Sequence, residues 1–301
     1  MSVINTLKKT FNWQRLKNNL FYLLKYDLFD ERYKIKDETI EDCIYEFDEI
    51  KPNLKQLDVL DENDTIELLK TQPKSFARYG DGEIAIMRGE DSIFQEYNAK
   101  LASRLKELLI RKKDNLYIGL NSSYFHSPTR YSSRNRKFYR LYATEYRRFF
   151  VNICDPNNVY LDACCFGGYF RHGDTFDFDA HFSKVKELFK GKSIVIVCGT
   201  GILEKLESNI FELGTVKGIV SAPTKNAFDK YDIILKETLQ KASKDDLVCI
   251  ILGMTATVLA ADLADAGYLA WDVGHMAKDY DAYIKKLEKT DAVIDNFFAP
   301  D

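Results

Sequence analysis

The sequence predicts an α/β fold: a Rossmann-like, mostly parallel sheet flanked by helices, with a helical extension at the N-terminus. Apolar β-like runs alternate with helical segments from residue 61 onward, which is typical of a sheet built from β-α-β units. Most of these runs end in short polar or glycine-containing loops. Because the carboxyl ends of parallel strands share one edge of a sheet, we expect these loops to converge on a ligand site.

Seven segments are expected to be strands because they are short apolar runs bounded by glycine, proline or polar residues. They cover residues 76–79, 116–120, 159–161, 193–198, 216–220, 246–252 and 268–273. Helical spacing of apolar residues predicts helices among them. These helices cover residues 61–70, 98–113, 182–189, 231–243 and 258–265, with another within 126–150 and a charged helix after residue 275.

The composition argues against several classes of protein. The 301 residues carry a net charge of −3, so the overall basic charge of a nucleic-acid-binding protein is missing, and the Arg- and Tyr-rich segment 126–150 is interpreted as a packed helix. No apolar run reaches the roughly 18 residues of a membrane-spanning helix. The N-terminus lacks the apolar core of a signal peptide. Six scattered cysteines without a C-x-x-C pair predict a reduced, cytoplasmic protein.

Two domains are expected, a helical extension over residues 1–60 and a catalytic domain over residues 61–301. The extension begins with a basic, amphipathic segment at residues 1–35. Such a segment packs on its own catalytic domain or on a second copy of the chain, as apolar helix faces usually do. The alternative is a peripheral contact with the anionic inner face of a membrane.

The stretch Arg78-Tyr79-Gly80-Asp81-Gly82-Glu83 is the central motif. It reads as the end of a strand followed by an acidic turn. In an extended backbone Asp81 and Glu83 project to the same face, and two hard oxygen ligands beside Arg78 suit a divalent metal that holds a diphosphate. Gly80 and Gly82 leave room for the ligand. The alternative is a polar turn in which Arg78 pairs with a carboxylate.

The loops after the other strands supply further candidates for binding a nucleotide-sugar. The turn at residues 199–201 leads from a strand toward a helix, an arrangement in which backbone N–H groups and a helix N-terminus face an anion. The dinucleotide fingerprint is incomplete there, because position 204 is Glu. The candidates are Asn121, Gly199, Thr200, Gly201, Ala222, Pro223, Asn226, Gly253, Thr255 and Ala256.

The motifs, taken together and in order, resemble those of the GT-D type glycosyltransferases. The resemblance covers residues 62–296. It rests on five motifs: Arg-Tyr-Gly-Asp-Gly-Glu at 78–83, Gly-Thr-Gly at 199–201, Ala-Pro-Thr-Lys-Asn-Ala-Phe at 222–228, Leu-Gly-Met-Thr-Ala-Thr-Val-Leu-Ala-Ala-Asp-Leu at 252–263 and Asp-Val-Gly-His at 272–275. It implies a Rossmann-like fold, a UDP-sugar donor, and a divalent metal held by Asp81 and Glu83. It also implies a glycan or glycoprotein acceptor, in the synthesis of surface polysaccharide or the glycosylation of surface proteins at the cytoplasmic side of a membrane.

The chemistry of such a transfer requires charge neutralisation on the departing diphosphate, which a Mn²⁺ or Mg²⁺ ion and Arg78 would provide. Candidates for a base that activates the acceptor hydroxyl are Asp272, His275 and Asp279. The His275 imidazole is also a candidate third metal ligand or a donor to a diphosphate oxygen. Two alternatives are another nucleotide-dependent enzyme, such as a dehydrogenase or methyltransferase, and a non-catalytic nucleotide- or glycan-binding module.

Overall fold

The computed structural model describes residues 57–110, 114–126 and 131–299. The contacts divide the chain into two compact units. Of the described residues, the larger comprises 58–110, 114–122, 157–170 and 176–299, and the smaller comprises 57, 123–126, 131–156 and 171–175. The predicted amphipathic segment 1–35 and the rest of the extension up to residue 56 lie outside the described residues, so the proposed domain boundary at residue 60 stays a prediction. Within the described residues, no helix is long and apolar enough to cross a membrane.

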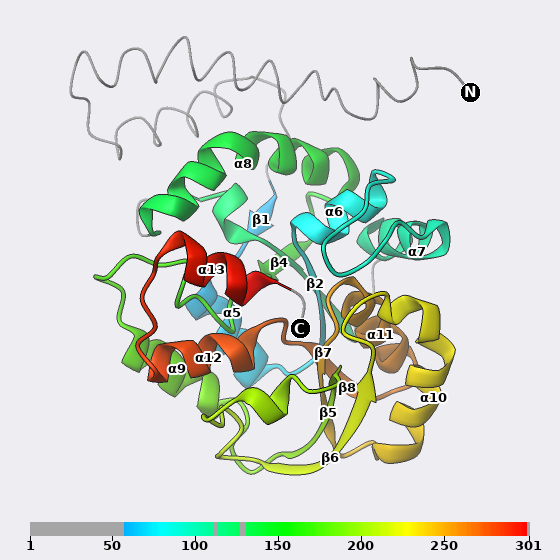
Figure 1. Cartoon of the computed structure of the whole chain (residues 1–301). Coiled ribbons are helices and arrows are strands. Elements are labelled where there is room, and N and C mark those ends of the chain that lie inside the picture. Colours follow the sequence, from blue (N-terminus) through cyan, green and yellow to red (C-terminus); the bar gives the residue numbers. More distant parts are fainter. Residues whose placement is uncertain (1–56, 111–113, 127–130, 300–301) are drawn as a thin grey trace, which may run out of the picture. The chain divides into compact units, whose positions relative to one another are not determined.

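The larger unit is built on a parallel sheet (Figure 1) with the strand order β1-β4-β3-β2-β8-β7-β5-β6. Every strand pairing in the described residues is parallel. The strands are β1 (Asp58–Val59), β2 (Ser75–Tyr79), β3 (Leu116–Leu120), β4 (Val159–Asp162), β5 (Ser193–Gly199), β6 (Thr215–Ala222), β7 (Leu247–Ile251) and β8 (Leu269–Asp272). The predicted fold class and all seven predicted strands are confirmed. The two-residue strand β1 is an addition.

Helices cover both faces of this sheet, with α9 and α12 on one face and α7, α10 and α11 on the other (Figure 1). Their bounds are α5 (Glu62–Thr71), α6 (Asp81–Met87), α7 (Ala99–Ile110), α9 (Phe178–Glu187), α10 (Tyr231–Lys241), α11 (Met254–Asp265), α12 (Met276–Ile284) and α13 (Asp291–Phe298). Short 3₁₀ turns lie at η2 (Ser122–Tyr124), η3 (Leu203–Lys205) and η4 (Ala227–Lys230). The apolar runs at β5 and β7 are buried almost throughout, which explains why they lack alternation.

Three local expectations are corrected. The segment after Gly80 is the helix α6 rather than a turn, and α11 begins at Met254 rather than at residue 258. After Gly201 the chain forms only the one-turn η3 instead of an α-helix, so no helix N-terminus is offered to a phosphate there. The starts of α6 and α11 were not predicted because a glycine usually marks a turn. Here Gly80 and Gly253 are the N-cap residues of these two helices.

Strands β2 and β8 lie side by side in the middle of the sheet, at a break in the strand order that we call the switch point. Phe76 of β2 pairs with Trp271 of β8, and both side chains are fully buried. Strands β2, β3 and β4 follow one another in one direction from this point, and β8, β7 and β5 occupy the other side. Open α/β sheets bind ligands outside the carboxyl ends of the strands at such a point.

The smaller unit contains the long helix α8 (Ser133–Ile153), which confirms the helix predicted within 126–150. Its aromatic residues pack internally, since the Tyr124 ring lies 5.2 Å from that of Tyr146 and 6.3 Å from that of Phe150. The buried Arg147 donates a hydrogen bond to the carbonyl oxygen of Tyr124. This arginine therefore serves the packing of its own unit.

Candidate functional site

An ion pair joins the carboxyl ends of the two strands at the switch point. Arg78, the fourth residue of β2, places Nη2 2.8 Å from Oδ1 of Asp272, the last residue of β8. Its Nη1 donates to the carbonyl oxygen of Ala163, just after β4. Burial raises the pKa of the Asp272 carboxyl, and the charge and hydrogen bond of Arg78 oppose that rise. The structure thus brings together two predicted site residues from opposite halves of the sheet.

Gly274 is required by this pair, although the sequence analysis did not select it. Its φ is +53°, and a Cβ at this position would lie 2.0 Å from Nη2 of Arg78. Its N–H donates to Oδ1 of Asp272. Any side chain at position 274 would displace the guanidinium. The sequence shows a glycine between the last strand and His275. It does not show that this glycine lies against Arg78.

The two carboxylates of the acidic motif, Asp81 and Glu83, lie in the first turn of α6. The expectation that they project to the same face of an extended backbone is therefore wrong. Asp81 is exposed, whereas Glu83 is buried. Oε2 of Glu83 accepts a hydrogen bond of 2.7 Å from the N–H of Gly80. The Thr257 hydroxyl of α11 lies 2.9 Å from the carbonyl oxygen of Arg78 and 3.4 Å from Oε1 of Glu83. Thr257 therefore holds the strand end and the helix start together.

Burial raises the pKa of Glu83 to about 7, and the neighbouring negative charge of Asp272 adds to this rise. The Gly80 N–H and, more weakly, the charge of Arg78 oppose it. Desolvation also raises the pKa of Asp81. More than a third of Asp81 is exposed, however, so solvent screening keeps that effect small. Because the pKa of Glu83 lies near neutral pH, a cation bound beside this carboxyl group would favour its ionised form.

The start of α11 lies against the start of α6. A Cβ on Gly82 would approach the sulfur of Met254 to 2.8 Å, so a side chain there would have to displace the Met254 side chain. Gly253, the N-cap of α11, is exposed with φ +50°. Thr255 and Ala256 are buried, so of these three predicted site residues only Gly253 presents itself to a ligand. In the first turn of α11, the N–H groups of Thr255 and Ala256 donate to the carbonyl oxygens of Leu252 and Gly253.

The loops predicted to hold the nucleoside follow β5 and β6 and are tied to each other. The Thr200 N–H and hydroxyl both donate to the carbonyl oxygen of Ala222. Gly199 packs closely on Thr224, whereas Gly201 has φ +80° and open space around the position of a Cβ. Of this group, Thr200 and Pro223 are exposed and Gly201 is half-buried.

Asn226 connects two loops through hydrogen bonds, a role that was not predicted from the sequence. It adopts a left-handed conformation with φ 52°. Its Oδ1 accepts from the N–H of Glu96, and its own N–H donates to the carbonyl oxygen of Phe94. It therefore fastens the segment 92–97 to the loop after β6. Asn121, also predicted, is buried at the end of β3.

His275 is the N-cap residue of α12, and its half-buried ring lies among aromatic rings. The ring centroids of Phe94, Phe297 and Phe298 are 5.6, 5.7 and 5.6 Å away. Asp279, another base candidate, is buried, and its Oδ2 accepts from the N–H groups of Gly168 and Tyr169. These hydrogen bonds to the Asp279 carboxylate hold the loop at residues 168–169 in place.

Among the described residues, no three side chains of His, Cys, Asp or Glu come close enough to hold a metal ion together. The predicted set of Asp81, Glu83 and His275 is therefore not assembled, because His275 belongs to the aromatic group. Two hard carboxylates in one helix turn still fit an ion such as Mg²⁺, which proteins commonly bind through one or two carboxylates together with substrate phosphates and water. Asp81 and Glu83 are the residues that would hold it.

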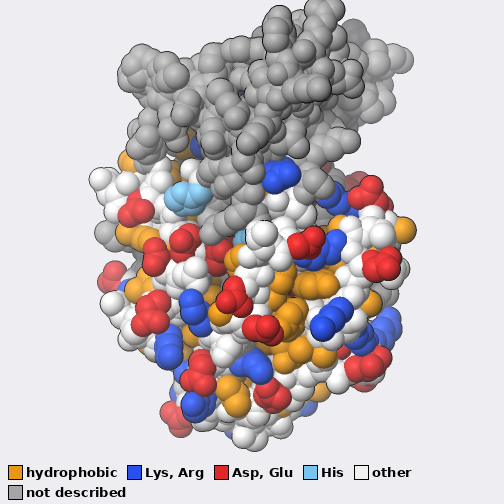
Figure 2. All heavy atoms as spheres, turned by 90° about the vertical axis from the view of Figure 1, so that its left-hand side faces the viewer, with side chains coloured by type: hydrophobic (Ala, Val, Ile, Leu, Met, Phe, Trp, Pro, Cys, Tyr) orange, Lys and Arg blue, Asp and Glu red, His pale blue; other side chains and the backbone are white. Residues whose placement is uncertain are grey.

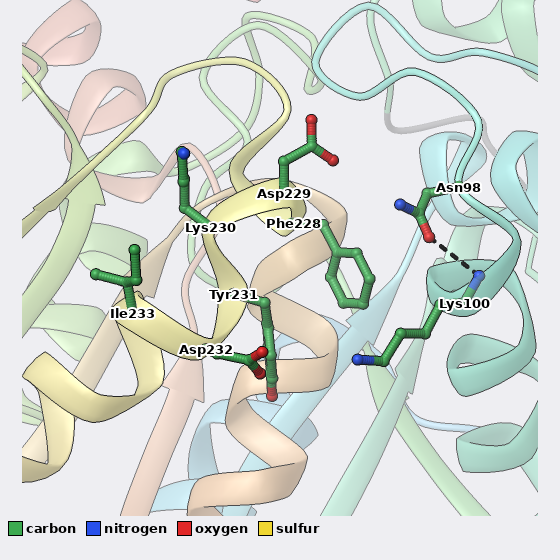
Figure 3. Close-up of a pocket in the computed structure, with 8 residues that line it drawn as sticks. All are labelled: Asn98, Lys100, Phe228, Asp229, Lys230, Tyr231, Asp232 and Ile233. Atoms are coloured by element: carbon green, nitrogen blue, oxygen red, sulfur yellow. Dashed lines mark hydrogen bonds between the residues drawn. The ribbon is translucent and has the colours of Figure 1, made fainter.

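A separate hollow of about 400 Å³ lies beside the start of α10 (Figure 3). Its lining residues are Asn98, Lys100, Phe228, Asp229, Lys230, Tyr231, Asp232 and Ile233. Phe228 and Tyr231 are buried, so the aromatic rings support the wall rather than stand free in it. None of the predicted site residues lines this hollow, and it is distinct from the strand ends at which the ion pair lies.

The part of the chain that contains the site is similar to known proteins. A model of the glycosyltransferase GT-D fold family matches residues 76–299. Among curated relatives, the probable glycosyl transferase Gly of Streptococcus gordonii is 27% identical over 238 residues, 77% of this chain. Glycosyltransferase GlyD of Streptococcus pneumoniae serotype 4 is 26% identical over 241 residues, 78% of this chain. The matches include 34% and 29% of these relatives, so the chain spans about a third of their length.

Solved structures agree with the fold described above. One, described as the domain of unknown function 1792 with a distinct glycosyltransferase fold, has a TM-score of 0.70 and 34% identity, over 77% of this chain and 83% of that one. A glycosyltransferase of the same domain type from Streptococcus sanguinis has a TM-score of 0.70 and 27% identity, over 77% and 86% of the two chains. The resemblance inferred from the motifs is confirmed, and the chain belongs to the glycosyltransferase GT-D fold family.

Proposed function

We propose that this chain is a metal-dependent glycosyltransferase that moves a sugar from a UDP-sugar to a hydroxyl group of a glycan or glycoprotein. The observation that carries the proposal is the Arg78–Asp272 pair at the switch point of a parallel sheet, with Asp81 and Glu83 in the first turn of the helix that follows β2. A cation held in place beside two carboxylates suits a metal-bound diphosphate better than any other common ligand.

The proposed roles follow from the contacts. Arg78 is held by Asp272 and by the carbonyl oxygen of Ala163, so it would meet the developing charge of the leaving diphosphate without having to be reoriented. A divalent ion bound by Asp81 and Glu83 would supply further charge neutralisation.

The contacts of the three candidate bases support one choice among them. Asp272 is paired with Arg78, and Asp279 accepts from two backbone N–H groups. Both carboxylates therefore already accept hydrogen bonds from groups of the protein. We assign the proton transfer from the acceptor hydroxyl to His275, because an imidazole is the side chain that most often serves as a general base.

The test is release of UDP from a panel of UDP-sugars, measured with Mn²⁺, with Mg²⁺ and with a chelator. Metal-dependent release that increases when an acceptor glycan is added would support the proposal. A nucleotide-binding module would bind UDP in calorimetry without releasing it from any donor. A dehydrogenase or methyltransferase would instead turn over its own cofactor and leave the UDP-sugars intact.

A further inference from the structure

We infer that Phe298 is a specificity-determining residue on which the sugar ring of the acceptor packs, beside the reacting groups. This inference rests on the proposed function, because it assigns the acceptor side of that same site. The chemical class of ligand is a saccharide that presents an apolar C–H face to an aromatic ring. Phe298 ends α13, in the last part of the described chain.

The ring of Phe298 is exposed yet held in a defined orientation. The residue is 42% exposed, whereas its neighbour Phe297 is buried. The Phe298 ring stands edge-to-face to the rings of Phe297 and His275, at 4.8 and 5.6 Å between centroids. Edge-to-face contacts fix a ring without covering both of its faces. An exposed aromatic ring that has little freedom to move is suited to stacking, because little entropy is lost when a ligand binds.

The helix that carries this ring is anchored rather than loosely attached. Ile294 and Phe297 of α13 belong to a small apolar cluster with Tyr169, Phe170 and Ala282. The rings of Phe170 and Phe297 lie 4.8 Å apart. Thr290 caps the start of the helix with its side chain. Phe298 is therefore fixed relative to the segment after β4, which lies on the opposite side of the switch point from β5 and β6.

This placement favours the acceptor over the nucleotide. The nucleoside is assigned to the loops after β5 and β6, on one side of the Arg78–Asp272 pair. Phe298 belongs to the other side through its anchor at Phe170, and it touches His275, the residue after Gly274. A sugar stacked there would present its hydroxyl to the imidazole. The side that carries α9, α12 and α13 faces the viewer in Figure 2, where hydrophobic side chains form a band bordered by charged ones.

The experiment measures saccharide binding and nucleotide binding separately on the full chain. Saturation-transfer NMR with the methyl β-glycosides of glucose, galactose and N-acetylglucosamine, in the presence of UDP and Mn²⁺, reports the saccharide. Calorimetry with UDP and Mn²⁺ reports the donor site. The variants are Phe298→Ala and Phe298→Trp, with Ile284→Ala as a control, because Ile284 is 48% exposed on the neighbouring α12 and touches none of these rings in the contacts described.

We expect Phe298→Ala to weaken binding of the best glycoside by about three- to tenfold, while Phe298→Trp and Ile284→Ala retain it and all three retain UDP affinity. Equal glycoside binding by Phe298→Ala and the parent, or no binding of any glycoside by the parent, would overturn the inference. Weaker UDP binding by Phe298→Ala would assign the ring to the nucleotide and also overturn it. Absence of metal-dependent UDP binding in the parent would instead refute the proposed function.

Discussion

Arg78 and Asp272 are separated by 194 positions in the sequence, and their side chains meet at 2.8 Å where β2 and β8 end. The Asp272 side chain is 3% exposed and that of Arg78 is 19% exposed. Removal of one partner from such a pair leaves the other charge with little water to solvate it. The pair is therefore both the centre of the proposed site and a structural contact between the two halves of the sheet.

The first prediction concerns this pair. Asp272→Asn should lower the free energy of unfolding by on the order of 3 kcal/mol, because it leaves Arg78 with an uncompensated charge. Glu212→Gln is the control, since the Glu212 side chain of its pair with Lys186 is 50% exposed and the pair should contribute less than about 1 kcal/mol. Urea unfolding measures both. Similar losses in the two variants would show that the Arg78–Asp272 pair behaves as a surface pair.

The second prediction concerns Gly274. Gly274→Ala should abolish transfer, because the new Cβ occupies the position of the Arg78 guanidinium. The matched control is Gly191→Ala, because Gly191 also has a positive φ, of +68°, but no atom lies within 4 Å of its Cβ position. Both variants should lose roughly 1–2 kcal/mol of stability from the backbone conformation. Gly274→Ala alone should lose UDP affinity, and equal UDP affinities would exclude the steric explanation.

The third prediction concerns the pH dependence that follows from Glu83. Its pKa in the folded chain is about 7, against an ordinary value of 4.5. The folded state thus holds this proton more tightly than the unfolded state, so the contribution to stability is present below pH 4.5 and is lost as the pH rises through 7. The loss amounts to about 3 kcal/mol. Metal binding requires the ionised form, so metal affinity should rise over the same interval.

Glu83→Gln tests this directly. Metal-free Glu83→Gln should be more stable than the parent at pH 8, with a flatter dependence of stability on pH between 4.5 and 7, and it should be inactive. Glu67→Gln, at an exposed position on α5, serves as the control. If chemical unfolding gave the same pH profile for Glu83→Gln and the parent, Glu83 would not be the group that titrates.

The fourth prediction concerns metal binding by Asp81. Asp81→Ala should remove the dependence of UDP affinity on Mn²⁺ and leave stability within about 1 kcal/mol of the parent, because the residue is exposed. Asp64→Ala is matched to it, since Asp64 is also an exposed acidic residue in the first turn of a helix. Calorimetry with UDP, with and without Mn²⁺, distinguishes the two. Unaltered Mn²⁺ dependence in Asp81→Ala would place the metal elsewhere.

The sheet could be predicted well from the sequence because β5 and β7 are short, continuous apolar runs. Such runs are typical of strands that are buried on both faces of a parallel sheet. The sequence also identified Arg78 and Asp272 individually. It could not pair them, since contacts across 194 positions depend on the order of the strands. The starts of α6 and α11 were missed because Gly80 and Gly253 resemble turn residues, and the role of Gly274 became visible only with its neighbour in place.

The position of β2 between β3 and β8 has a consequence for synthesis of the chain on the ribosome. Residues 75–79 emerge long before residues 269–272, so the edge of β2 that later pairs with β8 has no partner while most of the chain is being made. An uncovered strand edge invites pairing with other chains, and pairing over so long a separation is slow. Truncations that end before residue 269 should therefore aggregate, and activity should appear only after the last strand has been released.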